Sequence, residues 1–336
     1  MFKKPDIAMF YCNYSFFIVT LRVLIVHKMA HSNYSRPLDN PDAVLNFTTK
    51  TLGINLKEKQ IAAIVKAEHD MRSEIKPDLF TLNGNYFRCK SYKTESNRWK
   101  LRKKIVQELY DLPRLDDDDK IKLGCGGAKP QTIVKKDAQA YIIIGLPAAG
   151  KSSISSKLAD YTGSYVLDSD FAKRKLPEFK HYGATIVHEE SDMLIFPRHV
   201  EGKPADFQSL FEKCVKEKIN ICTLKIGYST AGIIELCHKF STYKYKIHIV
   251  LVALDRQKAT IRAINRFNNT KRYVSLGLIF DCYANDPTLT YYRLKALHDE
   301  NPLFESMCKI STDVPKGSPP KIKNIVNDSP LKDIYV

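Results

Sequence analysis

The sequence predicts an α/β fold, in which a doubly wound, mostly parallel sheet carries helices on both faces and follows a mainly helical N-terminal extension. Apolar, β-rich runs indicate strands, and segments with helical spacing lie between them, an alternation typical of parallel sheets covered on both faces. A glycine-rich turn joins the first strand to the helix after it. The predicted strands are 141–144, 164–167, 220–226 and 246–253, and the predicted helices run to about residue 160 and over 185–196, 207–215, 233–240 and 257–267.

The turn after the first strand fits a phosphate-binding loop, because it carries the pattern G-x-x-x-x-G-K-S. Gly145 and Gly150 let backbone N–H groups approach phosphate oxygens, and the helix N-terminus attracts the same anion. Lys151 is expected to reach the β- and γ-phosphates, Ser152 to place its hydroxyl on Mg²⁺, and Ser153 to lie among the nucleotide-binding residues. The sequence therefore predicts a P-loop NTPase-type core that binds ATP and Mg²⁺.

Charge and cysteine content limit the partners. The 336 residues carry a formal net charge of +16, which favours a polyanionic partner, although enzymes of phosphorylated metabolites also collect Lys and Arg. Nucleic acid is therefore kept as a less favoured partner than a small molecule. The eight cysteines are scattered without a C-x-x-C pair, so they indicate neither a zinc site nor a disulfide framework and fit a reducing, cytoplasmic compartment.

Composition divides the chain into four regions. The C-terminal region is rich in Pro, Lys, Ser and Asp and has little apolar periodicity, which predicts a flexible tail. The four regions are an apolar N-terminal segment at 1–28, a mainly helical region at 29–114, the catalytic domain at 115–300 and the tail at 301–336.

The most apolar stretch of the chain is residues 7–27, which follow Lys3 and Lys4. This layout is typical of a signal peptide or a single membrane span, but polar residues and Arg22 interrupt it. Three interpretations stay open: a targeting segment or membrane anchor, a mis-assigned start with synthesis beginning at Met29, or a helix packed on the body.

Two charged runs precede the catalytic core. A basic and aromatic cluster between Arg88 and Lys104 is interpreted as the solvated side of a helix, with phosphate binding beside the Trp99 ring as the alternative. Asp116 to Asp119 are four consecutive carboxylates, which cannot all converge on one ion. They predict a solvated turn.

An acid pair follows the second predicted strand. Asp168 and Asp170 come at its carboxyl end, where ligands of open α/β sheets bind. One can accept a proton from a hydroxyl nucleophile while the other orients Mg²⁺ or water. The alternative is a helix cap, because aspartates commonly begin helices. His188, a lone histidine beside acids, is left out of the mechanism.

Arg262, Arg266 and Arg272 follow the last strong strand. A lid-like segment there can bring cationic groups over a transferring phosphate and stabilise its charge. For Arg262 an exposed helix position is an equal alternative.

The segments GLPAAGKSS and VLDSDFAKRKLPEF, with the later arginines near 271–274, resemble the zeta-toxin family of P-loop kinases over roughly residues 120–295. The resemblance implies that the γ-phosphate of ATP passes to a hydroxyl of a nucleotide-like metabolite of the UDP-N-acetylglucosamine or NAD type. It also implies that Lys151 holds the triphosphate and that Asp170 is the general base. Asp168 would then join Ser152 at the metal, and Arg266 and Arg272 would contact phosphates.

The resemblance further implies a toxin or secreted effector that acts in a cytoplasm, its own or that of a host cell, and an antitoxin or chaperone as protein partner. The chain departs from the family at Lys225, because the family's strand usually ends in an acid followed by Gly and Thr. Two alternatives therefore remain: a polynucleotide 5′-hydroxyl kinase, and an inactive nucleotide-binding interaction protein.

Overall fold

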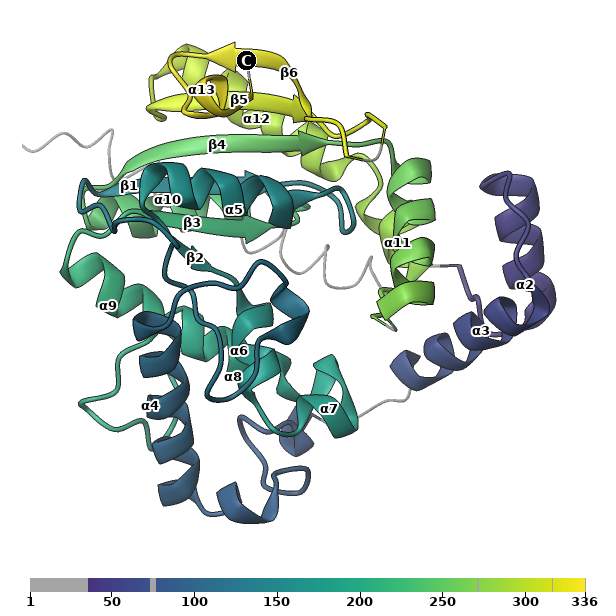
Figure 1. The fold of residues 1–336 in the computed structure, drawn as a ribbon, viewed down its shortest axis with the longest axis horizontal. Coiled ribbons are helices and arrows are strands. Elements are labelled where there is room, and N and C mark those ends of the chain that lie inside the picture. The colour runs from purple at the N-terminus through teal and green to yellow at the C-terminus, as the bar shows by residue number, and fades with distance from the viewer. Residues whose placement is uncertain (1–35, 73–76, 271, 316, 336) are drawn as a thin grey trace, which may run out of the picture.

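The computed structural model of the chain describes residues 36–72, 77–270, 272–315 and 317–335 (Figure 1). The apolar stretch 7–27 and the alternative start at Met29 lie outside the described residues. Within the described ranges, no helix is long and apolar enough to cross a membrane.

A six-stranded sheet forms the centre of the molecule, with strand order β2-β3-β1-β4-β5-β6. All neighbours pair in parallel except β5 and β6, which are antiparallel. The mostly parallel sheet confirms the predicted fold class. The strands are β1 Gln139–Ile144, β2 Tyr165–Leu167, β3 Ile221–Lys225, β4 Lys246–Ala253, β5 Ser306–Ser311 and β6 Lys321–Val326.

Helices cover both faces of this sheet. From β1 the chain crosses to β2 on one side, whereas from β3 it crosses to β4 on the other, so right-handed crossovers place the intervening helices α5 and α10 on opposite faces. The region from β1 to β5 contains α5 Lys151–Thr162, α6 Ser169–Lys175, α7 Phe179–Tyr182, α8 Ala184–Ile195, α9 Leu210–Lys216, α10 Thr230–Thr242, α11 Arg256–Thr270, η5 Leu278–Tyr283 and α12 Asp286–Glu300, and α13 Leu331–Tyr335 follows β6.

The N-terminal extension is mainly helical, as predicted. Its first part packs beside η5, where Arg36 forms an ion pair with Asp281 at 2.8 Å and the Phe47 ring lies 5.4 Å from that of Phe280. Its last helix instead packs on α6, α8 and α9, and Figure 1 shows these two parts on different sides of the molecule. The elements are α2 Pro41–Asn46, η1 Phe47–Thr51, α3 Glu58–Arg72, η2 Pro77–Leu79, η3 Lys90–Tyr92 and α4 Glu95–Asp111.

The interpretation of the basic cluster as a solvated helix face is wrong for its arginines. Arg98 is buried and donates to Glu178 Oε1 at 2.8 Å and to Glu190 Oε1 at 2.7 Å. Arg102 donates to the same oxygen of Glu190 at 2.6 Å and stacks on the Trp99 ring at 4.3 Å. These side chains join α4 to Glu178, which caps α7, and to Glu190 on α8, so they are not available to phosphates, and the lysines of the cluster face solvent.

The expectation of a flexible tail is also wrong for the residues that the structure describes. β5 pairs with β4 from His248 to Ala253, and its Met307, Cys308 and Ile310 are buried. Lys309 interrupts the apolar residues of this short strand. The spacing of apolar residues in the sequence was therefore only weak evidence for a strand. Tyr161 on α5 donates to Asp333 at 2.8 Å, which fastens α13 to the body.

The buried ion pairs of Arg98 and Arg102 with Glu178 and Glu190 generate a prediction about the stability of the fold. Replacing Arg98 with Met leaves Glu178 buried without its cation and Glu190 with Arg102 alone, so we expect a loss of about 3–5 kcal/mol in the free energy of unfolding. Urea denaturation followed by circular dichroism measures it. Lys103→Met is the matched control, because Lys103 lies on the same helix in an exposed pair with Asp206 and its loss should cost less than about 1 kcal/mol. Equal unfolding midpoints for the two variants would contradict the role of these ion pairs.

Candidate active site

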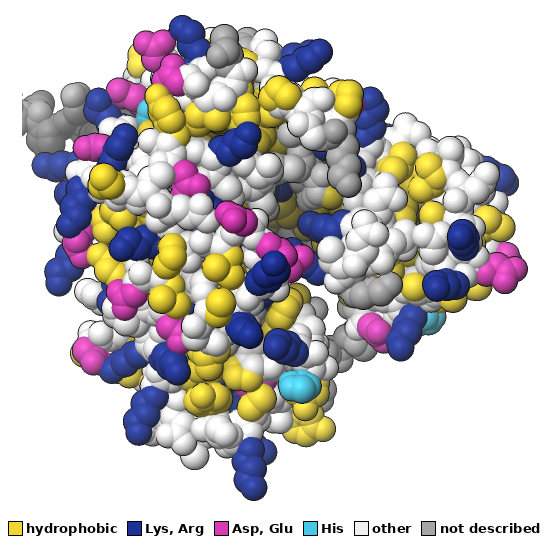
Figure 2. Space-filling view, viewed as in Figure 1, with side chains coloured by type: hydrophobic (Ala, Val, Ile, Leu, Met, Phe, Trp, Pro, Cys, Tyr) yellow, Lys and Arg dark blue, Asp and Glu magenta, His cyan; other side chains and the backbone are white. Residues whose placement is uncertain are grey.

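A cleft of ≈ 1080 Å³ opens at the carboxyl edge of the sheet. Parallel pairing brings strand ends together there, since Ile144 at the end of β1 is in register with Lys225 of β3 and Leu251 of β4. The cleft is lined by the loop after β1, by α6 and α8, and by residues of α10 and α11. Figure 2 shows Lys and Arg side chains over the whole drawn face, with acidic side chains among them.

The glycine-rich loop between β1 and α5 has the geometry of an anion cradle. Gly150 has φ 91° and caps α5, and a Cβ atom there would lie 3.3 Å from Thr312 Cγ2. Lys151 Nζ donates to the carbonyl oxygens of Gly145 and Leu146 at 2.7 and 2.8 Å. Burial lowers the pKa of Lys151 to about 8. The ammonium is therefore held inside the loop, where an incoming phosphate can replace the two carbonyls.

The structure separates the roles of the acid pair. Asp168 is the N-cap of α6 and accepts from the backbone N–H of Asp170 at 2.9 Å, so the cap interpretation applies to it. Burial and the nearby Asp170 raise the pKa of Asp168. Asp170 accepts from Lys173 and from Arg272, each at 2.9 Å. Burial acts to raise its pKa, but Lys173, Arg174 and Arg272 together lower it.

The structure brings Arg266 and Arg272 into the cleft. Arg272 bridges Asp170 and Asp119, both at 2.9 Å. Arg266 has a buried Nε atom that lacks a hydrogen-bond partner among the described residues. Arg262 also lines the cleft, but it donates to the carbonyl oxygen of Thr312 at 2.7 Å. Arg266 is thus the arginine with the most bonding capacity left for a ligand.

The solvated-turn interpretation of the aspartate run is wrong for its last two residues. Asp118 lines the cleft, and burial raises its pKa. Asp119 Oδ1 accepts from Arg174 at 3.0 Å and from Arg272 at 2.9 Å. Among the described residues there is no group of three or more His, Cys, Asp or Glu side chains that could hold a metal ion.

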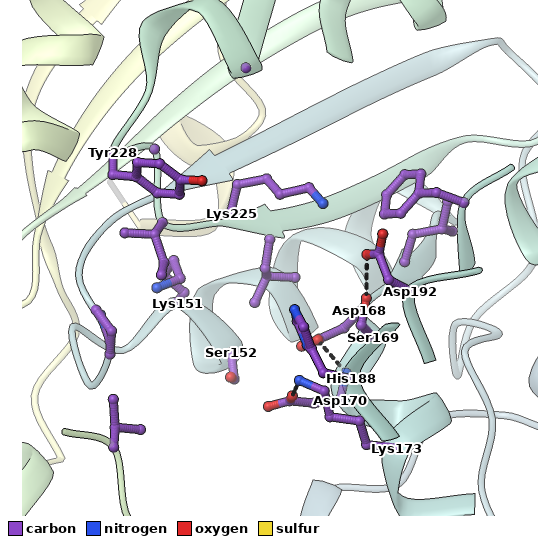
Figure 3. A pocket seen from close by; sticks show the side chains of 18 of the residues that line it. Lys151, Ser152, Asp168, Ser169, Asp170, Lys173, His188, Asp192, Lys225 and Tyr228 are labelled. Atoms are coloured by element: carbon purple, nitrogen blue, oxygen red, sulfur yellow. Dashed lines mark hydrogen bonds and ion pairs between the residues drawn. The ribbon is translucent and has the colours of Figure 1, made fainter. Parts of the chain in front are cut away.

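Several lining residues were not recognised in the sequence. Lys173 follows Asp170 by three positions on α6, a spacing that predicts contact on one helix face. His188 and Asp192 line the cleft from α8, and Asp192 accepts from Ser169 at 3.1 Å. His188 was set aside as a lone histidine; burial and Lys173 lower its pKa, which favours the neutral imidazole. Figure 3 shows it beside Asp170.

A family comparison covers the part of the chain that contributes most of this cleft. Residues 126–289 match the family described as zeta toxin. This segment is a zeta-toxin domain. No curated protein matches the chain.

Three solved structures are similar in fold to the chain that carries this zeta-toxin domain. One is from the PezAT chromosomal toxin–antitoxin system of Streptococcus pneumoniae, with 15% identity, a TM-score of 0.47, and coverage of 72% of this chain and 86% of that one. Another is a putative kinase from Chloroflexus aurantiacus, with 15% identity, a TM-score of 0.34, and coverage of 43% and 75%. The AvrRxo1-ORF1:-ORF2 complex gives 16% identity, a TM-score of 0.43, and coverage of 71% of each chain.

The lowered pKa of Lys151 predicts how nucleotide binding by the zeta-toxin domain depends on pH. The ammonium is charged below about pH 8 and is lost above it, whereas the phosphates of ATP are already ionised in this range. ATP affinity should therefore fall about fivefold between pH 8 and pH 9, because one proton must be regained on binding. Calorimetric titration with ATP at several pH values measures this.

Lys151→Arg is the control, since a guanidinium stays charged throughout this pH range. Its affinity for ATP, although weakened by the changed geometry, should not vary between pH 7 and 9. A wild-type affinity that is constant up to pH 9 would contradict the assignment of Lys151 as the phosphate ligand.

Proposed function

We propose that this chain is a P-loop kinase that transfers the γ-phosphate of ATP to a hydroxyl group of a nucleotide-like metabolite. One observation carries the proposal: a single cleft brings together the loop lysine Lys151, the carboxylate of Asp170 and the cation of Arg266. A phosphate cradle, a proton acceptor and a phosphate-stabilising cation are the groups that phosphoryl transfer needs. The zeta-toxin family supports the same reaction class.

The residues of the loop fit ATP with Mg²⁺. Thr312 packs closely against Gly150, so a side chain there would be crowded, and Gly150 and Ser152 line the cleft. We assign Gly145 and Ser153, which flank them in the chain, to the same nucleotide-binding loop. Ser152 and Asp168 would hold Mg²⁺, which neutralises phosphate charge when bound. One carboxylate oxygen of Asp168 caps α6, which leaves the other available. Mg²⁺ commonly takes one or two protein ligands and completes its shell with phosphates and water.

Asp170 is proposed as the general base. The acceptor oxygen forms a bond to the γ-phosphorus, the bond to the β-phosphate oxygen breaks, ADP leaves, and the hydroxyl proton passes to the carboxylate. Lys173, and to a smaller extent the ion pair with Arg272, lower the pKa of Asp170 and with it the basicity of the carboxylate. Arg272 therefore has to exchange this carboxylate for the phosphate, and that exchange raises the pKa of Asp170 when the proton must be taken up.

We assign the half of the cleft that carries Tyr228 to the acceptor, and this half favours a substrate with a planar ring. Tyr228 and Tyr283 line it, with ring centroids 5.7 Å apart, and can pack against a base. We therefore place UDP-N-acetylglucosamine or NAD as the acceptor types. A polynucleotide 5′-hydroxyl kinase is the second candidate, motivated by the net charge of +16. The spread of basic side chains over the face in Figure 2 does not single out a track for a polynucleotide.

As a zeta toxin, such a kinase would consume a metabolite in any cell that supplies ATP. We propose that it acts in a cytoplasm, either that of the producing cell or that of a host, and that an antitoxin or chaperone protein restrains it before then.

Incubation with labelled ATP, Mg²⁺ and a panel of UDP-sugars, NAD and 5′-hydroxyl RNA tests the function. The proposal expects label on a UDP-sugar or on NAD. Label on RNA alone would replace it with the polynucleotide kinase, and tight ATP binding without transfer to any acceptor would support an inactive nucleotide-binding protein.

Asp170→Asn tests the general base. The amide cannot take up the proton, so the transfer rate should fall by about 10²–10⁴-fold. ATP affinity should not weaken, because the variant also removes a carboxylate that competes for Arg272. Asp206→Asn, an exposed carboxylate paired with Lys103, is the control and should transfer at the wild-type rate. An Asp170→Asn variant with full activity would show that another group is the general base.

A further inference from the structure

Lys225 is a cation in the acceptor half of the cleft that the mechanism above does not use. It is the last residue of β3, in register with Ile144 immediately before the phosphate loop. Figure 3 shows its side chain extended across the cavity, away from Tyr228 and toward Asp192. Its Nζ lies 4.3 Å from the centroid of the Phe196 ring.

Within the part of the chain that the structure describes, Lys225 forms no ion pair. The other lysines of the cleft have polar partners: Lys151 donates to two loop carbonyls, Lys173 pairs with Asp170, and Lys239 pairs with Glu235 at 2.9 Å. Four of the cleft arginines are also bonded to side-chain or backbone oxygens. Arg198 donates to Glu189, Arg174 to Asp119, Arg262 to Thr312 and Arg272 to Asp170.

An unpaired, half-buried ammonium is costly. Removing it from water disfavours the charged form, and burial does lower the pKa of Lys225. A cation over an aromatic face recovers only part of that cost. An anion that enters the cleft with the substrate recovers more, because a phosphate accepts charge-assisted hydrogen bonds from the ammonium. The site is therefore incomplete until such an anion binds.

We propose that Lys225 is a specificity-determining residue that binds a phosphate group of the acceptor, so that the enzyme selects phosphorylated acceptors over their unphosphorylated counterparts. This inference rests on the proposed kinase function. It places three parts of the acceptor: a hydroxyl at Asp170, a ring near Tyr228, and a phosphate at the Lys225 ammonium, on the side of that group that does not face the Phe196 ring.

Binding to pairs of probes that differ by one phosphate tests the inference without requiring transfer. UMP and uridine, and ribose 5-phosphate and ribose, are titrated into the protein in the presence of Mg²⁺ and a saturating non-hydrolysable ATP analogue, which fills the phosphate loop. The wild-type protein should bind at least one phosphorylated member about tenfold more tightly than its partner, as expected for a hydrogen bond to a charged group. Lys225→Met should abolish that preference, and Lys225→Arg should keep part of it.

Lys239→Met is the matched control. Lys239 also lines the cleft, but Glu235 already neutralises it, so the variant should keep the wild-type preference for the phosphorylated probes. A wild-type protein without a preference in either pair would overturn the inference, as would a Lys225→Met variant that keeps the preference.

The same probes with labelled ATP separate this inference from the kinase proposal. A phosphate preference that depends on Lys225, without transfer to any acceptor of the panel, would contradict the kinase and leave the binding site in place. Transfer that is equally efficient in wild type and Lys225→Met, with no change of acceptor preference, would leave the kinase in place and overturn the role of Lys225.

Discussion

The buried ion pairs of Arg98 with Glu178 and Glu190 are the interaction on which the acid-bearing side of the cleft depends. Glu178 lies three residues after α6, the helix that carries Asp170, and Glu190 lies on α8 next to the lining residues His188 and Asp192. One guanidinium from α4 therefore fixes the spacing of two helices that contribute acids to the cleft. Because a carboxylate left alone in the interior is strongly unfavourable, the three elements are expected to assemble together.

Charge balance within the cleft explains how a basic site stays folded without a bound phosphate. Arg272 forms ion pairs with Asp119 and Asp170, and Lys151 donates hydrogen bonds to two carbonyl oxygens. These contacts satisfy the cations with groups that a triphosphate can replace, so the incoming anion meets cations that are already in place and exchanges partners with them. The consequence for Asp170 is chemical as well as structural, because Arg272 is one of the cations, with Lys173 and Arg174, that lower the pKa of this carboxylate.

The sequence predicted the parts of the site that are local in the chain. The loop pattern located Lys151 and Ser152, and apolar runs located the four strands that carry the cleft, because their signals lie within a few consecutive residues. Contacts between distant segments left no such signal. Asp119 was interpreted as a solvated aspartate, yet it accepts from Arg272, 153 positions later in the chain. The arginines of α4 follow a basic pattern that is typical of an exposed helix, and only the two glutamates opposite them make burial favourable.

The same contacts indicate that the zeta-toxin domain does not complete its own site. Residues on both sides of the matched segment 126–289 contribute to it. From the N-terminal side, Arg98 positions the acid-bearing helices and Asp119 binds Arg272. From the C-terminal side, Thr312 donates to the carbonyl oxygen of Ala149 in the phosphate loop at 2.7 Å and accepts from Arg262. Since Thr312 directly follows β5, the strand pairing that orders β5 also supports the loop. The unit that forms the complete cleft therefore has to include α4 at one end and β5 at the other.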